Sequence, residues 1–460
     1  MTFRPILVAL AALALIGGTV VLLRNASARK PHDLRIFFTC DVRGRLVPCG
    51  CFTGQMGGLT RIATMVGEKR HENLLKVDVG DALEGTADYE RIEHRYILEA
   101  LAILGYDAAN LGHREAQLPA AQLRELKAVS RVPLLAGNLL DAGTRTPIFD
   151  THRIVTRGKW RIALVGVMDE HVPGENLGEG LVLEKMNTTL AKLLPSLRPK
   201  VDAVVLLAFA DESALHTLAR EFYELDVILG GKVSQPAQRL ERENRSAIFY
   251  TTNQSRALGT LDLRFAKSGR VTPHGGEVTL VHDGIPENAA ILVLAAKYRE
   301  EIRHTKLDLD DPSRQQADMI PGVKPAGSYV GSESCLNCHP SAGRTWHSSG
   351  HGHAFATLVK RQADADPNCL GCHTVGFGSP SGYRREFGAD RLINVGCESC
   401  HGPGSVHVAQ RQQGATDGGT FRTLGSGDCQ KCHHGEFSRP FEFDKFWPHV
   451  RHGRESGTGR

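Results

Sequence analysis

The sequence predicts a layered α/β domain followed by a mostly helical, loop-rich domain. Three observations lead to this fold class: short apolar runs alternate with helical patterns up to about residue 305, a polar stretch with prolines follows, and aliphatic residues then become sparse. The cysteines divide in the same way, since three of the 11 lie at 40–51 and eight at 335–432. The two groups therefore indicate two different chemistries in one chain.

Length and charge narrow the range of functions. With 460 residues, of which 41% are hydrophobic, the chain can bury the cores of two or three domains. The formal net charge is only +4 and is spread along the chain, which does not favour nucleic acid as the partner.

The first 30 residues predict export. Residues 6–23 form an unbroken run of apolar and small residues, about as long as a membrane span requires. Residues 26–28, Ala-Ser-Ala, fit a signal-peptidase site, so 1–30 is either a cleaved signal peptide or an N-terminal anchor. In both cases we expect the bulk of the chain in the periplasm, held at the inner membrane if the span is retained.

Residues 33–305 predict the layered α/β domain. Apolar, β-branched runs that stop at Asp, Asn or Gly predict strands at 34–44, 74–81, 132–141, 160–169 and 201–211. Between them, 89–106 and 118–129 carry the apolar spacing of helices. The polar loops at the strand ends are where we expect function.

Residues 306–327 predict a linker, because they are polar, contain proline and show no apolar period. Residues 328–460 are rich in Gly, His, Ser and Cys and carry too few aliphatic side chains to build an ordinary core. Something other than aliphatic side chains must therefore fill the interior of this second domain.

The pattern Cys-x-x-Cys-His occurs four times in this second domain and is the attachment pattern of c-type haem. Two thiols add to the two vinyl groups of one porphyrin, and the adjacent histidine reaches the iron. The predicted attachment residues are Cys335, Cys338, Cys369, Cys372, Cys397, Cys400, Cys429 and Cys432, and the predicted proximal iron ligands are His339, His373, His401 and His433. Four covalently bound c-type haems would fill the interior that aliphatic residues do not.

Other interpretations of these cysteines explain less. Zinc ribbons use paired Cys-x-x-Cys but need no histidine directly after each pair. A thioredoxin-like dithiol occurs once, within a βαβ pattern. A disulfide framework has no reason to repeat the terminal histidine four times.

Each haem iron has a sixth position, and the second domain offers seven further histidines. They are His347, His351, His353, His407, His434, His449 and His452. Bis-histidine ligation gives low-potential haems suited to moving electrons. For any one of these histidines, a surface position or a contact to a haem propionate is the alternative.

The turn after the third motif bears on His407. Gly402, Pro403 and Gly404 bend the chain sharply between His401 and His407. So short a loop does not carry His407 round the porphyrin to the opposite face. We therefore expect His407 to bind the iron of a neighbouring haem.

The stretches SCLNCHPSAGRTWHSSGHGHAFATL and VGCESCHGPGSVHVA resemble the multihaem cytochrome family typified by the tetrahaem electron acceptor of hydroxylamine oxidation. The resemblance covers roughly residues 328–455. It implies His351 or His353, His407 and His452 as distal iron ligands, and periplasmic or membrane redox proteins as partners. Some members of that family have an open iron site, so one five-coordinate haem is compatible with the resemblance.

The first domain resembles the bacterial 5′-nucleotidase and UDP-sugar hydrolase branch of metallophosphoesterases. The resemblance rests on five motifs in the family's order: FFTCDVRGRL, VDVGDALEG, YDAANLGHRE, VVLLAFAD and DVILGGKVSQ. It implies a layered α/β metallophosphoesterase-like fold. Members of the family use two divalent metals to activate water on a phosphate ester.

Most of the ligands that this resemblance implies are absent. Asp41 and Asp81 are present, but Arg43 replaces a histidine, and His113-Arg114 replaces Asn-His. Further along, Ala208-Phe209 replaces Ser-His, and Lys232 and Ser234 replace the last two histidines. Cationic Arg and Lys cannot ligate a metal. We therefore do not expect a two-metal hydrolase.

Three cysteines leave two interpretations of the first motif open. Cys49 and Cys51, with Cys40, Asp41, Asp81 and His113, would form a rebuilt site for a single metal ion, since thiolates favour zinc, copper(I) or iron. A disulfide or free thiols are the alternative. In addition, Arg43, Arg45, Arg61 and Lys232 are candidates for binding an anion where the phosphate would lie.

The sequence thus favours an exported tetrahaem cytochrome for periplasmic electron transfer. Its phosphoesterase-like domain would dock a partner, bind an anion or sense a metal. Two enzymatic alternatives stay open: a redox-linked phosphoesterase, and a multihaem reductase with one open haem. A third alternative is a structural cytochrome module in a larger membrane complex.

Overall fold

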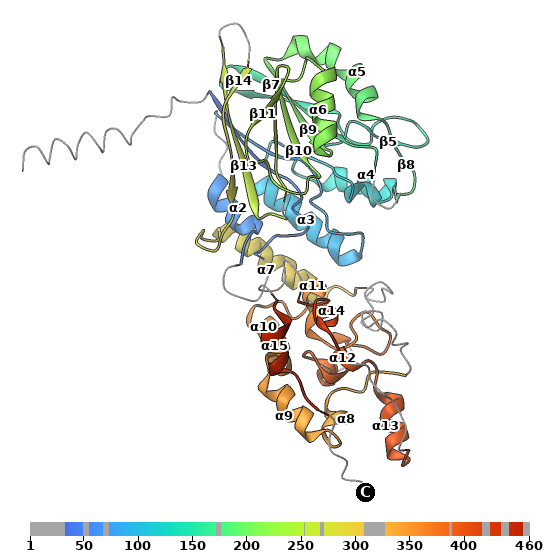
Figure 1. Ribbon diagram of the computed structural model, residues 1–460. Coiled ribbons are helices and arrows are strands. Elements are labelled where there is room, and N and C mark those ends of the chain that lie inside the picture. Colours follow the sequence, from blue (N-terminus) through green and yellow to red (C-terminus); the bar gives the residue numbers. More distant parts are fainter. Residues whose placement is uncertain are drawn as a thin grey trace, which may run out of the picture.

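The computed structural model describes residues 33–48, 55–67, 73–171, 176–252, 254–266, 271–307, 327–385, 389–415, 424–433 and 441–453. An α/β part and a helical part follow one another along the chain, which confirms the predicted fold class (Figure 1). The expected export segment and most of the expected linker lie outside the described residues. Within those residues, no helix combines the length and the apolar character needed to cross a bilayer.

Two six-stranded sheets form the centre of the α/β part. The first contains, in spatial order, β14 (Val271–Leu280), β13 (Ala257–Phe265), β1 (Leu34–Thr39), β2 (Leu74–Asp78), β3 (Ala108–Asn110) and β4 (Leu134–Leu135). The second contains β11 (Glu241–Glu243), β12 (Ser246–Tyr250), β10 (Val227–Gly231), β9 (Ala203–Phe209), β7 (Trp160–Met168) and β6 (His152–Arg157). Parallel pairing dominates the inner strands of both sheets.

Helices cover the outer faces of the two sheets (Figure 1). On the side of the first sheet, α7 (Ala289–His304) contacts both α2 (Leu59–Val66) and α3 (Asp88–Ile103). α5 (Met186–Leu197) and α6 (Glu212–Glu221) cover the second sheet, and α4 (Ala120–Val129) precedes β4. Side-chain caps fix the N-termini of two of these helices. Asp211 accepts a hydrogen bond from the backbone of α6, and Asn288 accepts from the backbone of α7.

The expected strands mostly form, but one expected run is divided. Residues 132–141 contribute β4 to the first sheet and β5 (Leu139–Asp141) to a small separate pair with β8 (Leu181–Leu183). Asn138 lies between the two strands and donates to the carbonyl oxygens of Met168 and Glu184 at 2.7 and 2.8 Å. Because these bonds hold the chain in a bend, one strand cannot continue through it.

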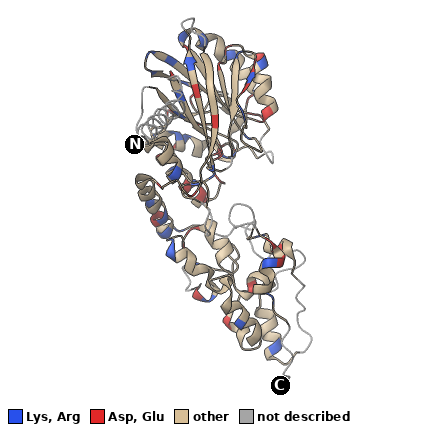
Figure 2. Ribbon diagram, turned by 60° about the vertical axis from the view of Figure 1, so that its left-hand side comes forward, with Lys and Arg blue, Asp and Glu red and all other residues tan. Residues whose placement is uncertain are grey.

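The described part of 327–453 contains short helices and no extended strand. These are α8 (Glu333–Leu336), α9 (Pro340–Ser348), α10 (Ala354–Lys360), α11 (Pro367–His373), α12 (Cys397–His401), α13 (Ser405–Gln412), α14 (Ser426–Cys429) and α15 (Phe443–Phe446). Only eight buried hydrophobic residues cluster here, whereas one large cluster fills the α/β part. Lys, Arg, Asp and Glu are interspersed over both parts (Figure 2).

Candidate functional site

The four Cys-x-x-Cys-His motifs lie on or at the end of short helical turns. The second motif ends α11 and the third forms α12. In the first and fourth motifs the histidine backbone N–H donates to the carbonyl of the first cysteine, at 3.0 Å for His339 and 2.8 Å for His433. Positions i, i+3 and i+4 of a helical turn share one face. This local geometry therefore brings two thiols and an imidazole to the same side.

Three pairs of imidazole rings face one another across the helical part. His339 and His407 have ring centroids 6.3 Å apart with 27° between their planes. His351 lies 6.0 Å from His433, and His401 lies 5.8 Å from His452. Two imidazoles on opposite faces of one metal ion, each bound at about 2.0 Å, have centroids about 6 Å apart. The spacing of all three pairs therefore fits a shared iron.

The fourth proximal histidine has a different environment. His373 Nδ1 lies 2.7 Å from the carbonyl oxygen of Ala354, so an Nδ1–H donates there and Nε2 remains for iron. No ring contact pairs another imidazole with His373 among the described residues. His353 Nε2 lies 2.9 Å from the carbonyl oxygen of His347, so the structure sets His351, rather than His353, opposite a proximal histidine.

The loops of the phosphoesterase-like motifs carry backbone strain. Asp41, Arg43, Asp81 and Lys232 have φ angles of 58°, 44°, 57° and 55°, in the left-handed region that non-glycine residues seldom adopt. Such strain persists where the surrounding structure fixes a functional geometry. The surrounding structure therefore fixes the backbone at these four positions.

Arginine side chains lie beside the two aspartates. Arg43 Nε donates to Asp41 Oδ1 at 2.5 Å, and Thr252 Oγ1 donates to Asp41 Oδ2 at 3.1 Å. The backbone N–H of Arg114 donates to Asp81 Oδ1 at 3.0 Å, and its Nε lies 3.6 Å from Asp81 Oδ2. Burial, followed by the nearby Glu115, raises the pKa of Asp81 well above its ordinary value. Guanidinium groups thus supply positive charge beside both carboxylates.

Asp169, which the sequence analysis did not single out, organises the other side of this site. It is 3% exposed, and its carboxylate lies 2.7 and 2.9 Å from Lys232 Nζ and 3.0 Å from His113 Nε2. Burial alone would raise the pKa of Asp169, but the hydrogen bonds from His113 and Lys232 outweigh it and lower that pKa. The run 160–169 does end in this aspartate, which is the one signal that the sequence offered.

The remaining expected ligands do not assemble into a metal site within the described residues. Asp41, Asp81 and His113 form no metal-holding group there, and the His113 ring packs edge-on against Phe209 at 5.2 Å. Cys40 is buried with Sγ 3.6 Å from the carbonyl oxygen of Gly80. Cys49 and Cys51 lie outside the described residues, so the thiolate site stays a prediction.

The expected anion-binding cations are largely engaged with protein groups. Arg43 and Lys232 bind aspartates, as described above. Arg45 Nη2 lies 3.5 Å from Gln254 Oε1, and Arg61 donates to the carbonyl oxygen of Gln55. Arg45 and Arg61 are only 8% and 6% exposed. An incoming anion would therefore compete with existing contacts for most of this charge.

Comparison with known proteins assigns the helical part. A family model described as "Cytochrome c554 and c-prime" matches residues 334–402, which contain the first three haem motifs. Cytochrome c-554 of Nitrosomonas europaea is 36% identical over 91 residues, or 16% of this chain and 39% of that protein.

The α/β part has relatives of its own. The 5′-nucleotidase of Bos taurus is 25% identical over 324 residues, covering 63% of this chain and 55% of that enzyme. Two solved structures from Thermus thermophilus share the fold. The sulfate thiohydrolase SoxB matches with a TM-score of 0.52 and 18% identity, over 60% of this chain and 61% of that chain. A 5′-nucleotidase precursor matches with a TM-score of 0.51 and 18% identity, over 67% of this chain and 68% of that chain. The chain spans about two fifths of the length of the matched cytochrome and just over half of the length of the matched 5′-nucleotidase.

Fold and site together define a two-part protein in which a haem-binding region follows a hydrolase-type α/β domain. In particular, a 5′-nucleotidase-like metallophosphoesterase domain covers the N-terminal two thirds, and a cytochrome c554-type domain lies at the C-terminus. Both resemblances inferred from the sequence are confirmed. The cytochrome match supports covalently bound haem and a multihaem electron-transfer role.

Proposed function

We propose that this protein is an exported tetrahaem cytochrome for periplasmic electron transfer, with a phosphoesterase-like domain that does not hydrolyse phosphate esters. The main support for this proposal is the set of three imidazole pairs, whose ring centroids lie 5.8 to 6.3 Å apart. A bis-histidine c-type haem supplies a reversible one-electron carrier. His339 with His407, His433 with His351 and His401 with His452 would hold three such haems, and His373 would hold the fourth.

The stoichiometry is tested by measuring haem and metal content together on the purified full-length protein. Four thioether-linked haems per chain, retained through acid–acetone extraction, are expected. Two or fewer haems per chain under full maturation would refute the tetrahaem proposal. Beyond the haem iron, the same preparation should contain no metal in stoichiometric amount.

The charge around the phosphoesterase-like site disfavours metal-dependent hydrolysis. Arg43, Arg114 and Lys232 lie beside carboxylates that would otherwise face metal ions, and a bound divalent ion would meet three fixed cations. We expect turnover of phosphate esters near background with added Mn²⁺ or Zn²⁺. Robust hydrolysis that disappears in Asp81→Ala would instead establish the redox-linked phosphoesterase alternative.

A reductase with one open haem is the second candidate function, and His373 favours it. Its Nδ1 is held by the carbonyl oxygen of Ala354, and it belongs to none of the three imidazole pairs described above. Carbon monoxide added to the reduced protein should shift the spectrum of one haem if that site is open. An unchanged spectrum would leave only the electron-transfer role.

The location and partners follow from the N-terminal segment and the cytochrome resemblance. We propose a periplasmic position, anchored at the inner membrane if residues 1–30 are retained, with periplasmic or membrane redox proteins as partners and no nucleic acid. The phosphoesterase-like domain would dock such a partner, bind an anion or sense a metal. Fractionation of cells expressing the full chain, with and without residues 1–30, distinguishes an anchored from a released protein.

A further inference from the structure

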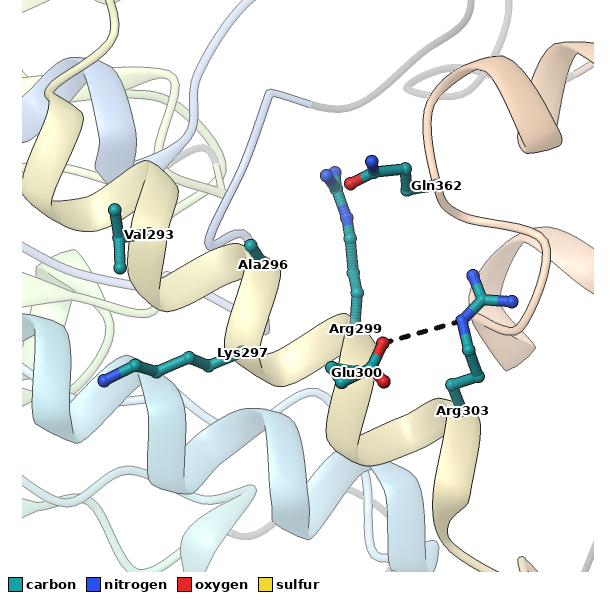
Figure 3. Close-up of a pocket in the computed structure, with 7 residues that line it drawn as sticks. All are labelled: Val293, Ala296, Lys297, Arg299, Glu300, Arg303 and Gln362. Atoms are coloured by element: carbon teal, nitrogen blue, oxygen red, sulfur yellow. Dashed lines mark ion pairs between the residues drawn. The ribbon is translucent and has the colours of Figure 1, made fainter.

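The α/β part and the helical part are locked together along α7. Arg303 of α7 makes two hydrogen bonds to Asp364, at 2.8 and 2.9 Å, and its carbonyl oxygen accepts from Arg385 at 3.0 Å. Ala365 packs into the core of the α/β part. On the outer side of α7, Arg299 extends toward Gln362 beside a cavity of about 500 Å³ (Figure 3). These contacts hold the segment before the second haem motif against the α/β part.

Glu93 of α3 is the α/β residue that reaches this segment. It is 5% exposed, and Asn368 Nδ2 lies 3.4 Å from its Oε2 atom. Gly44 leaves room for the carboxylate, since a Cβ atom there would lie 2.3 Å from Glu93 Oε2. A buried carboxyl group therefore touches the residue that directly precedes Cys369, the first attachment cysteine of the second motif.

A second carboxyl group lies beside Glu93 across the interface. Asp366 caps α11, accepting from the backbone N–H of Asn368 at 3.0 Å, and it is in electrostatic contact with Glu93. Burial, followed by the charge of Asp366, raises the pKa of Glu93 well above its ordinary value, and burial raises the pKa of Asp366. Because Asn368 bonds to both acids, the two carboxyl groups lie close together, and like charges so placed cannot both ionise at low cost.

Charged groups of both signs surround this pair. Glu93 faces Arg45, Glu84 and Glu90 as well as Asp366, and Asp366 faces Arg299 and Arg45. The hydroxyl of Tyr298, 4% exposed on α7, lies near both acids and near Cys369. Glu84 also faces Arg43 and Arg114, whereas Arg45 and Arg299 are the arginines that face the Glu93–Asp366 pair. Uptake of one proton by the pair would relieve the repulsion between its two carboxyl groups.

We propose that Glu93 and Asp366 form a proton-binding site that couples the α/β domain to the redox state of the second haem. This rests on the proposed electron-transfer function. A haem held by His373 would supply one-electron chemistry at this place. Uptake of one electron from an external one-electron donor would be balanced by transfer of one proton from solvent to the pair, where one carboxylate would gain an O–H bond. The electron and the proton would leave together on oxidation, so the net charge would stay the same.

The test is a redox titration of the full-length holoprotein, followed by visible absorption between about pH 5 and 9. The midpoint potential of one haem should fall by about 59 mV for each tenfold fall in proton concentration, over the pH range in which the pair titrates. Glu93→Gln and Asp366→Asn should each flatten that dependence for the same component and leave the other three unchanged. Gln still accepts from Asn368, and Asn still caps α11, so both variants keep the interface contacts.

Glu99→Gln, on the same helix α3, is the matched control and should leave all four pH profiles as in the parent protein. If the titration is reversible but neither Glu93→Gln nor Asp366→Asn changes any pH profile, the proton-binding site is refuted while the electron-transfer role stands. If no haem component titrates reversibly, both proposals are refuted. If Glu93→Gln loses haem, Asp366→Asn alone provides the test. An Asp366→Asn variant with the pH profile of the parent protein would then refute the proton-binding site.

Discussion

The ring centroids of His339 and His407 lie 6.3 Å apart with 27° between the ring planes, although the second and third haem motifs and a Gly-Pro-Gly turn separate the two residues in the chain. His407 lies in the first turn of α13, close in the chain to the third motif, but faces the histidine of the first motif. This supports the prediction that His407 binds a neighbouring iron rather than the one held by His401.

Replacing His407 by Met should keep all four haems attached and raise the potential of one, because thioether ligation favours the ferrous state. A redox titration with low-spin absorption spectra measures the change. His353→Met is the matched control, since His353 is exposed and bonded to a backbone carbonyl. A titration of His407→Met that matches the parent protein would remove His407 from the ligands.

The contact of Asp169 with Lys232 and His113 should stabilise the α/β domain without metal. Asp169→Asn removes a buried charge partner and should lower the free energy of unfolding by about 1–3 kcal/mol at pH 7. The folded-state pKa of Asp169 is lowered, so this stabilisation is present above the ordinary aspartate pKa and is lost as pH falls through the folded-state value. Urea unfolding at several pH values measures it.

Asp150→Asn provides the comparison for that experiment. Asp150 pairs with Lys127 at 3.2 Å on the surface, where both side chains are largely exposed. Its removal should change the free energy of unfolding by about 0.5 kcal/mol or less. An Asp169→Asn variant as stable as Asp150→Asn would contradict the role given to Asp169.

Asp78 should make the stability of the α/β domain fall as pH rises. Burial raises its pKa to about 8, although Thr39 Oγ1 and the Gly80 N–H donate to its carboxyl group. Between its ordinary pKa and about 8, folding must therefore take up a proton, which costs more as pH rises and levels off above about 8. Asp78→Asn should gain about 1–3 kcal/mol over the parent protein at pH 8, with little gain at pH 4. Equal gains at both pH values would contradict this account.

Glu398, inside the third haem motif, should hold the start of the cytochrome domain. Its buried carboxylate accepts from the backbone N–H groups of Val330, Gly331 and Gly404 at 2.7–3.1 Å. Glu398→Ala leaves these donors without their acceptor and should destabilise the domain by about 2–4 kcal/mol in thermal unfolding followed by haem absorption. Glu333→Ala, an exposed acid on α8, should have little effect. Equal effects of the two substitutions would contradict this stabilising role of Glu398.

Chelation should leave the α/β domain unchanged, because Arg43, Arg114 and Lys232 supply the charge near its acids. We expect the same midpoint of thermal unfolding with and without EDTA. A clear fall after chelation, restored by Zn²⁺, would instead support a metal site that uses Cys49 and Cys51.

The sequence by itself determined the two-part fold and the positions of the haem-attachment motifs. Each Cys-x-x-Cys-His motif is a single helical turn, so its geometry depends on spacing alone. The order of the phosphoesterase motifs predicted the first domain, and the replacement of ligands by Arg43 and Lys232 was visible residue by residue.

Only the tertiary structure decided which histidines face each other. His351 and His353 have the same local sequence signal, but helix packing points one at His433 and ties the other to a backbone carbonyl. Asp169 and Glu93 gain their roles from neighbours on distant segments, across a sheet edge and a domain interface. Burial and opposing charge arise when those segments pack together, and no local pattern encodes them.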